Sequence, residues 1–171
     1  MTADAFKRSL KNHQDKGFFK NLKILRGIER ESLRVSEQGR ISQKNHPENL
    51  GSPLTSNDIT TDFAEALVEL VTPTFESAEE LFKHLNLLHR FLYSEMEGEM
   101  LWNFSMPCAF ENEQEIRIAE YGETNSGMLK HIYRKGLRLR YGSIMQCVSG
   151  IHYNFSLSKE SWHSLSEKAD Q

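Results

Sequence analysis

Residues 24–35 read Ile-Leu-Arg-Gly-Ile-Glu-Arg-Glu-Ser-Leu-Arg-Val, and the expected architecture is built outward from them. Glu29, Glu31 and Leu33 occupy every second position. This period of two is typical of a β-strand, because successive side chains of a strand point to opposite faces. Residues 38–40 (Gln-Gly-Arg) predict a turn after this strand.

Further strands are predicted at residues 59–63 and 64–71, before Pro73. The second stretch has a helix-favouring composition of Ala, Leu and Glu, but it alternates strictly, and we interpret it as a strand. Residues 41–55 contain two prolines and a glycine, and they predict a loop. A last strand is predicted over residues 151–157, which alternate polar and aromatic side chains.

A helix is predicted from Ser77 to about Met96. Ser77 and Glu80 have the spacing of a capping box, which satisfies free N–H groups at a helix start. The apolar stripe of this helix consists of Leu81, Leu85, Leu88 and Leu92. A short amphipathic helix is predicted before residue 23, and residues 95–112 are predicted to be irregular.

Charge and composition exclude several classes of protein. The chain has 21 basic and 24 acidic residues, a net charge of −3, which gives nucleic-acid binding no support. No apolar run approaches the roughly 20 residues needed to cross a bilayer. Cys108 and Cys147 are too few for a disulfide framework, and residues 1–10 lack the apolar centre of a secretory signal. We therefore expect a reduced, cytoplasmic protein with Cys147 as a core residue.

Acidic residues in strand-like, apolar surroundings are candidates for metal binding. They are Glu29, Glu31, Asp62 and Glu69. Carboxylates two residues apart on a strand share a face and suit hard cations such as Mg²⁺. The alternative, that Glu29 and Glu31 lie on the solvent face of an edge strand, is favoured by the residues alone. Glu69 has apolar neighbours and needs a metal or an arginine if it is buried.

His152 and the basic residues 130–140 have equally ordinary alternatives. A single strand histidine is more often a core or surface residue than a ligand, and a basic block is more often an exposed helix or loop face. Tyr133 and Gly136 flank Arg134 and weaken that alternative. The sequence contains no glycine-rich phosphate loop, so metal ions and arginines would have to hold any bound ATP.

Taken together, the chain resembles the proteobacterial-type glutamate–cysteine ligase family. The matching stretches, in order, are residues 26–35, 46–52, 59–73, 101–108, 119–122, 133–137, 140–146 and 149–156. The resemblance implies an α+β, glutamine-synthetase-like catalytic fold with a curved antiparallel sheet. Family members are several times longer, so we expect residues 1–171 to be the N-terminal portion of a single catalytic domain, inactive in isolation. The tail after Ser158 reads as the beginning of a helix.

The resemblance also implies an activity. ATP, the co-substrate, phosphorylates the γ-carboxylate of L-glutamate, and the amine of L-cysteine then attacks the acyl phosphate. The product is γ-glutamylcysteine, in the first step of glutathione biosynthesis. Three alternatives remain: a related ligase that uses another amine, a non-catalytic metal- or nucleotide-binding module, and an inactive truncated remnant.

Site residues follow from the resemblance position by position. The implied ligands of Mg²⁺, or of Mn²⁺ in its place, are Glu29, Glu31, Asp62, Glu69 and His152. Arg134 matches the arginine expected near the transferred phosphate. The implied amino-acid pocket consists of Phe63, Tyr133, Leu137, Gln146 and Asn154. These assignments reverse the interpretations of Glu29, Glu31, His152 and Arg134 that the residues alone favour.

Overall fold

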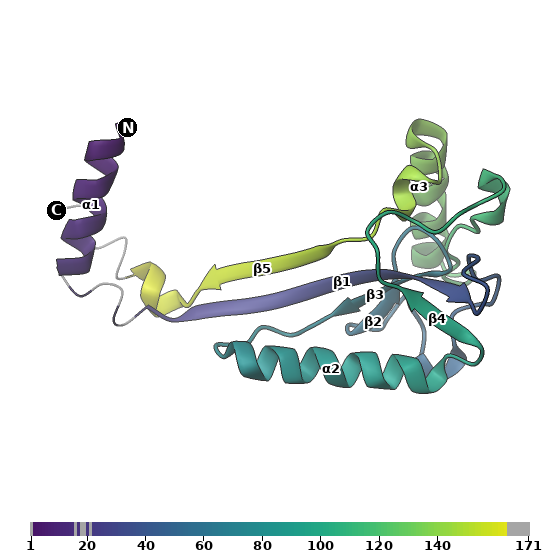
Figure 1. Cartoon of the computed structure of the whole chain (residues 1–171), viewed down its shortest axis with the longest axis horizontal. Coiled ribbons are helices and arrows are strands. Elements are labelled where there is room, and N and C mark those ends of the chain that lie inside the picture. The colour runs from purple at the N-terminus through teal and green to yellow at the C-terminus, as the bar shows by residue number, and fades with distance from the viewer. Residues whose placement is uncertain (1, 16, 18–19, 21, 164–171) are drawn as a thin grey trace.

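The computed structural model describes residues 2–15, 17, 20 and 22–163, which form an antiparallel sheet and several helices (Figure 1). The strands are β1 (Ile24–Ser36), β2 (Ile59–Thr61), β3 (Leu67–Val71), β4 (Glu99–Trp102) and β5 (Ile151–Leu157). β1 is the central strand: β3 pairs along one edge, with β2 outside it, and β5 and β4 pair with successive parts of the other edge.

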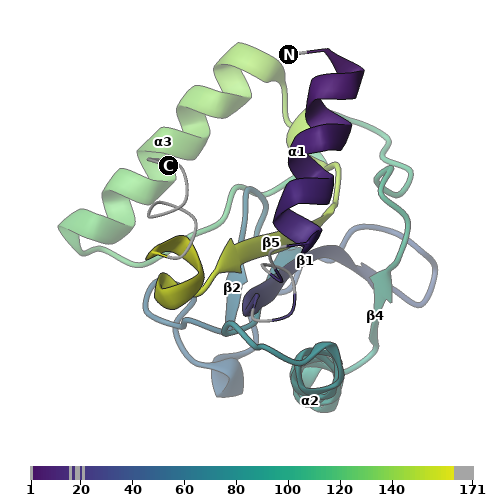
Figure 2. The ribbon, with the colours of Figure 1, turned by 90° about the vertical axis from the view of Figure 1, so that its left-hand side faces the viewer.

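Helices lie on both faces of this sheet and beyond its end (Figure 1 and Figure 2). They are α1 (Ala3–Asp15), α2 (Ala78–Glu95) and α3 (Asn125–Tyr141), with short 3-10 turns at Glu48–Leu50, Glu113–Glu115 and Met145–Cys147. Seen end-on, α2 lies below the strands and α3 above them (Figure 2). No helix in the part of the chain that the structure describes has the length and apolar character needed to cross a membrane.

Strand alternation divides the hydrophobic core between the two faces of the sheet. Val68 and Leu70 point to the lower face, where they pack with Leu88 and Leu92 of α2. Leu33 lies opposite Leu67 in the register and points to the upper face. The upper core also contains residues from the segments that flank α3: Cys108, Ile116 and Ile118 before it, and Cys147 after it. Both cysteines are buried and free, which confirms Cys147 as a core residue.

Most predicted elements are confirmed, with corrections at residues 62–63, where the strand predicted over 59–63 has already ended, at 64–66 and at 95–112. The Ser77 hydroxyl accepts the N–H of Glu80, and Met96 caps the other end of α2. Helix α1 lies in the predicted N-terminal segment, whose Phe18 and Phe19 are outside the described residues. Residues 95–112 are not wholly irregular, because they contain β4. Residues 64–66 form a turn and not the start of a strand, since Leu67 N–H bonds back to the Ala64 carbonyl.

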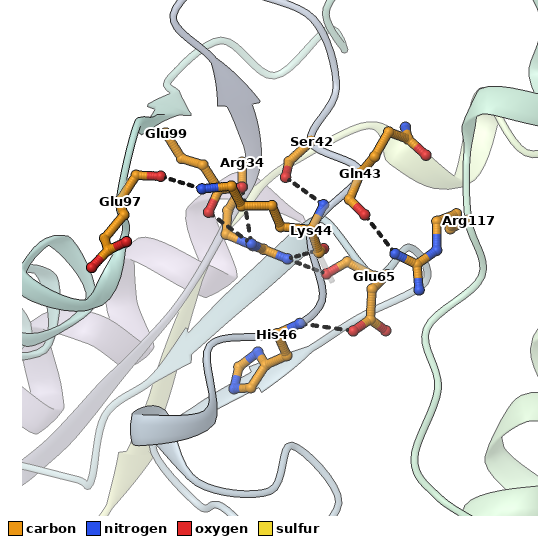
Figure 3. Close-up of polar contacts among 9 residues, drawn as sticks. All are labelled: Arg34, Ser42, Gln43, Lys44, His46, Glu65, Glu97, Glu99 and Arg117. Carbon is orange, nitrogen blue, oxygen red and sulfur yellow. Dashed lines mark hydrogen bonds and ion pairs between the residues drawn. The ribbon is translucent and has the colours of Figure 1, made fainter.

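A buried arginine joins three segments to the lower side of β1 (Figure 3). Arg34 is fully buried, and its Nη1 donates to both carboxylate oxygens of Glu99 at 3.0 Å. Its Nη2 donates to the carbonyls of Lys44 and Glu65 at 3.1 and 3.0 Å. This one side chain therefore holds β4, the loop after β1 and the turn before β3 in place.

If residues 64–71 formed one strand, strict alternation would place Glu65 on the same face as Glu69. In the structure Glu65 lies in the turn before β3 instead. Its carboxylate is buried in the turn and accepts the backbone N–H of His46 at 2.8 Å (Figure 3) and that of Glu120 at 2.9 Å. Two backbone donors thus satisfy both of its oxygens, and its position is explained by loop packing.

Candidate functional site

Three carboxylates from two adjacent strands gather on the upper face of the sheet, beside the upper core. Glu29 and Glu31 share this face because they are two residues apart in β1. Glu69 of β3 is the register partner of Glu31, and His152 of β5 is the register partner of Glu29. We call Glu29, Glu31, Glu69 and His152 the acidic face. The strand order therefore brings together residues that are far apart in the sequence.

The Glu29 carboxylate is held at both oxygens. His152 Nδ1 lies 3.0 Å from one oxygen, and Asn154 Nδ2 donates to the other at 3.0 Å. The hydrogen bond to Glu29, with the nearby charge of Glu31, raises the pKa of His152. Asn154, which the family resemblance assigns to the amino-acid pocket, thus also orients a candidate metal ligand.

Glu31 lies deeper than Glu29 and is held by backbone. Its carboxylate accepts the N–H of Gly150 at 2.9 Å, while its other oxygen lies 3.8 Å from His152 Nδ1. Gly150 is therefore the point where the chain turns onto the acidic face before β5 begins.

Two half-buried carboxylic acids carry the electrostatic signature of a crowded acidic site. Burial, followed by the like charges of Asp62, Glu31 and Glu29, raises the pKa of Glu69. Burial also raises the pKa of Asp62, against the opposing charge of Arg134. Like charges this close favour a bound cation, because a cation relieves their repulsion.

The donor set fits a hard divalent cation that keeps part of its water shell. Carboxylate oxygens are the ligands that Mg²⁺ prefers, and Mg²⁺ is commonly held by one or two carboxylates plus substrate phosphates. Within residues 2–15, 17, 20 and 22–163, no three His, Cys, Asp or Glu side chains converge closely enough to hold a metal ion by themselves. The acidic face thus has the chemistry of an open site, completed by water or substrate oxygens.

Arg134 lies at the border of this region, on α3. Its Nε donates to the Asp62 carbonyl at 2.5 Å, and its Nη1 donates to the Lys130 carbonyl at 3.1 Å. The remaining nitrogen, Nη2, has no hydrogen-bond partner among the described residues. The guanidinium is therefore anchored on one side and available to an anion on the other.

The other residues assigned to the amino-acid pocket are spread over three environments. Phe63 is 1% exposed in the upper core, and Leu137 packs against that core from α3. Tyr133 is exposed on α3, and Gln146 is half-buried in a 3-10 turn. The described residues do not gather these four into one enclosed pocket.

Tyr121 is a residue that sequence reasoning missed. It is buried, its hydroxyl donates to the Thr61 carbonyl at 2.7 Å, and its ring lies under the Arg134 guanidinium. The sequence signal that could have identified Tyr121 is its place in residues 119–122. This stretch matches the family, but the resemblance assigned no role to any of its residues.

Comparisons with known proteins agree on one family. A family model described as glutamate-cysteine ligase matches residues 8–171. Curated proteins named glutamate–cysteine ligase from Pseudomonas putida (strain W619) and Pseudomonas entomophila (strain L48) are 54% and 55% identical over 141 residues. Each match covers 82% of this chain and 27% of the relative, so the chain spans about a quarter of the length of these relatives.

Solved structures match as well. A crystal structure of glutamate–cysteine ligase from Francisella tularensis in complex with AMP has a TM-score of 0.85 at 44% identity, covering 88% of this chain and 30% of that one. A bifunctional glutathione synthetase from Pasteurella multocida has a TM-score of 0.78 at 34% identity, covering 91% and 20%. These likenesses confirm the predicted α+β fold.

Proposed function

Because this chain belongs to the glutamate–cysteine ligase family, we propose that it forms part of the catalytic site of an ATP-dependent ligase that joins L-glutamate to L-cysteine. Residues 1–171 would be the N-terminal portion of a single catalytic domain, at work in the cytoplasm. The observation that carries the proposal is the acidic face, held in a fixed geometry beside Arg134.

The proposed reaction has two steps. A γ-carboxylate oxygen of glutamate attacks the terminal phosphorus of ATP, which gives γ-glutamyl phosphate and ADP. The cysteine amine, in its neutral form, attacks the acyl carbon, inorganic phosphate leaves with the C–O bond pair, and the nitrogen gives one further proton to water as the amide forms. The product is γ-glutamylcysteine.

The acidic face would serve the first step. Glu29, Glu31, Asp62, Glu69 and His152 would hold Mg²⁺, or Mn²⁺, which when bound supplies positive charge to the ATP phosphates. To hold such an ion, the carboxylates must be kept in a fixed orientation. The paired contacts to the Glu29 oxygens and the Gly150 N–H bond to Glu31 support that orientation.

Arg134 would contact the transferred phosphoryl group. Its guanidinium is permanently charged, and anchoring it through Nε and Nη1 lowers the conformational freedom lost on binding an anion. Negative charge spreads over the phosphoryl oxygens in transfer, so a preplaced cation stabilises that state. Tyr133, Gln146 and Asn154 would line the amino-acid pocket, with Phe63 and Leu137 as its apolar support.

The test uses a chimera in which this chain replaces the matching quarter of the Pseudomonas putida ligase. We expect cysteine-dependent ADP release with glutamate, ATP and Mg²⁺, lost in the Glu29→Gln and His152→Ala variants and retained in Glu111→Gln, an exposed residue away from the acidic face. A folded chimera without cysteine-dependent ADP release would refute the proposed function.

The 171-residue chain alone is expected to show no turnover. Its acidic face is open to water, with 59% of the His152 side chain exposed, and an acyl phosphate needs a site that excludes water. Turnover by the purified chain, measured in the same ADP assay, would contradict this expectation.

A further inference from the structure

Tyr121 contacts the backbone at the point where β2 leads to Asp62. The side chain is 5% exposed, and its hydroxyl lies 2.7 Å from the Thr61 carbonyl and 3.1 Å from the Asp62 carbonyl. The same Asp62 carbonyl accepts the N–H of Arg134 Nε. One carbonyl oxygen therefore links the tyrosine, the arginine and a candidate metal ligand.

The ring of Tyr121 faces the cations of α3. The Arg134 guanidinium carbon lies 4.7 Å from the ring centroid, and Lys130 Nζ lies 5.0 Å from it. Both distances are within the range in which an aromatic face attracts a cation. The arginine is thus fixed by two hydrogen bonds and by a flat surface against which its planar group rests.

Helix α3 also packs closely against the backbone of Tyr121 and Gly122. A Cβ atom at Gly127, in the first turn of α3, would lie 2.4 Å from the Tyr121 carbonyl oxygen and 2.8 Å from that of Gly122. The helix therefore touches the 121–122 backbone directly, and only glycine fits there. The backbone of residues 121–122 therefore contacts the first turn of the helix, while the Tyr121 ring contacts the arginine that the helix carries.

We propose that Tyr121 is a positioning residue for Arg134: its ring holds the guanidinium so that Nη2 is presented to the phosphoryl group being transferred. This inference rests on the proposed function. It assigns a role to the stretch 119–122, which the proposed mechanism otherwise leaves without one. The ring, more than the hydroxyl, carries the effect, because the ring contacts the guanidinium and the hydroxyl contacts only backbone.

The kinetic test is a double-mutant cycle in the chimeric ligase. Tyr121→Leu should lower kcat about tenfold while the KM for glutamate changes little, and Tyr121→Phe, which keeps the ring, should stay within about threefold of the parent. In an Arg134→Ala background, Tyr121→Leu should have almost no further effect, because the group it positions is gone. Tyr153→Leu, an exposed tyrosine on β5, is the matched control.

The spectroscopic test uses the 171-residue chain and needs no activity. The Nε–H proton of Arg134, identified by the loss of its signal in Arg134→Lys, is shielded by the Tyr121 ring, whereas its hydrogen bond to the Asp62 carbonyl is common to the parent and both tyrosine variants. Its signal should keep its position in Tyr121→Phe and move downfield in Tyr121→Leu, where the ring is absent.

The outcomes separate the two proposals. An equal loss of kcat from Tyr121→Leu with and without Arg134 would overturn the positioning role, as would an Nε–H signal that Tyr121→Leu leaves unmoved. Absence of turnover in the parent chimera, with the expected Nε–H shifts, would instead refute the ligase and leave the Tyr121–Arg134 contact established.

Discussion

Asn154 and His152 bond to different oxygens of the Glu29 carboxylate, so each controls one half of its orientation. Removing the amide in Asn154→Ala leaves the carboxylate free to rotate about its contact with His152. We expect the affinity of the chain for Mn²⁺ to fall about tenfold, the usual cost of losing a partner that orients a metal ligand. Electron paramagnetic resonance titration of Mn²⁺ measures this directly.

Ser156→Ala is the control for that experiment, because Ser156 lies on the same face of β5 and, among the described residues, its hydroxyl bonds only to the Leu157 carbonyl. It should leave Mn²⁺ affinity unchanged. Equal affinities for the parent and Asn154→Ala would show that Asn154 does not orient the metal ligand.

Cys147 gives a prediction for alkaline pH. Burial, with the nearby Cys108, raises the pKa of the Cys147 thiol from 9.0 to about 12. Above pH 9 the unfolded chain loses this proton and the folded chain keeps it, so the stabilisation present below pH 9 is lost as the pH rises toward 12. Between pH 8 and pH 10 the loss of unfolding free energy from this thiol should be about 1.4 kcal/mol.

Urea unfolding at pH 8 and pH 10 measures this loss when the parent is compared with Cys147→Ala. The parent should lose more unfolding free energy than the variant over that interval, because the other titrating groups are common to both. Identical losses would place the Cys147 thiol in contact with water.

At the scale of elements, the Arg34–Glu99 pair gives the sharpest stability prediction. Both side chains are almost fully buried, at 0% and 4% exposed. Glu99→Ala leaves the arginine charge buried without its carboxylate, which typically costs about 3–5 kcal/mol. Chemical unfolding followed by circular dichroism gives this difference.

The exposed pair Arg40–Glu111 provides the comparison. Its side chains are 47% and 74% exposed. Glu111→Ala should cost less than about 1 kcal/mol, because water screens an exposed ion pair. A similar cost for both substitutions would mean that β4 is not held by the buried arginine.

Local patterns predicted the elements whose determinants are local. The capping box at Ser77 fixed the start of α2, and alternation identified β1 and β5. β4 was missed because four residues show too short an alternation, and its place depends on pairing with residues 33–36 far away in the chain. The turn at 64–66 was missed because its cause is the contact of Glu65 with two distant backbone N–H groups.

In the candidate site too, features with local determinants could be predicted from the sequence, and features that depend on distant contacts could not. Alternation placed Glu29 with Glu31, but which strand lies beside them is set by the order of strands in the sheet. The contact of Tyr121 with Arg134 links a loop to a helix, and no periodicity encodes such a contact. Only the family resemblance connected Arg134 with the acidic residues before the structure did so.

In the molecule as a whole, the two faces of the sheet differ in role: one is covered by a helix and the other carries the candidate site. The lower face is filled by α2, and the upper face is apolar at one end and acidic at the other. The acidic carboxylates therefore stand on β1 and β3, which also contribute Leu33, Val35 and Leu67 to the upper core and Val68 and Leu70 to the lower core. Such a base gives a binding site more precision than a loop would.

Helix α1 lies beyond the end of the β1–β5 ribbon (Figure 1), and none of its residues is buried. A helix of 13 residues with no buried side chain is marginal in water, since nucleating it costs more than its few hydrogen bonds return. β1, in contrast, is paired on both edges over much of its length. We expect the amides of α1 to exchange with solvent at least about a hundredfold faster than those of residues 29–35.

Hydrogen exchange followed by mass spectrometry tests this difference, with the peptide covering Leu88 and Leu92 of α2 as an internal reference for a packed helix. That peptide should exchange slowly, because its apolar stripe is buried on the sheet, although its hydrogen bonds are of the same kind as those of α1. The contrast between the two helices isolates packing as the source of protection. Slow exchange throughout α1 would mean that this helix packs against something in solution, and its exposed Phe6 and Leu10 would be the first residues to substitute in locating that contact.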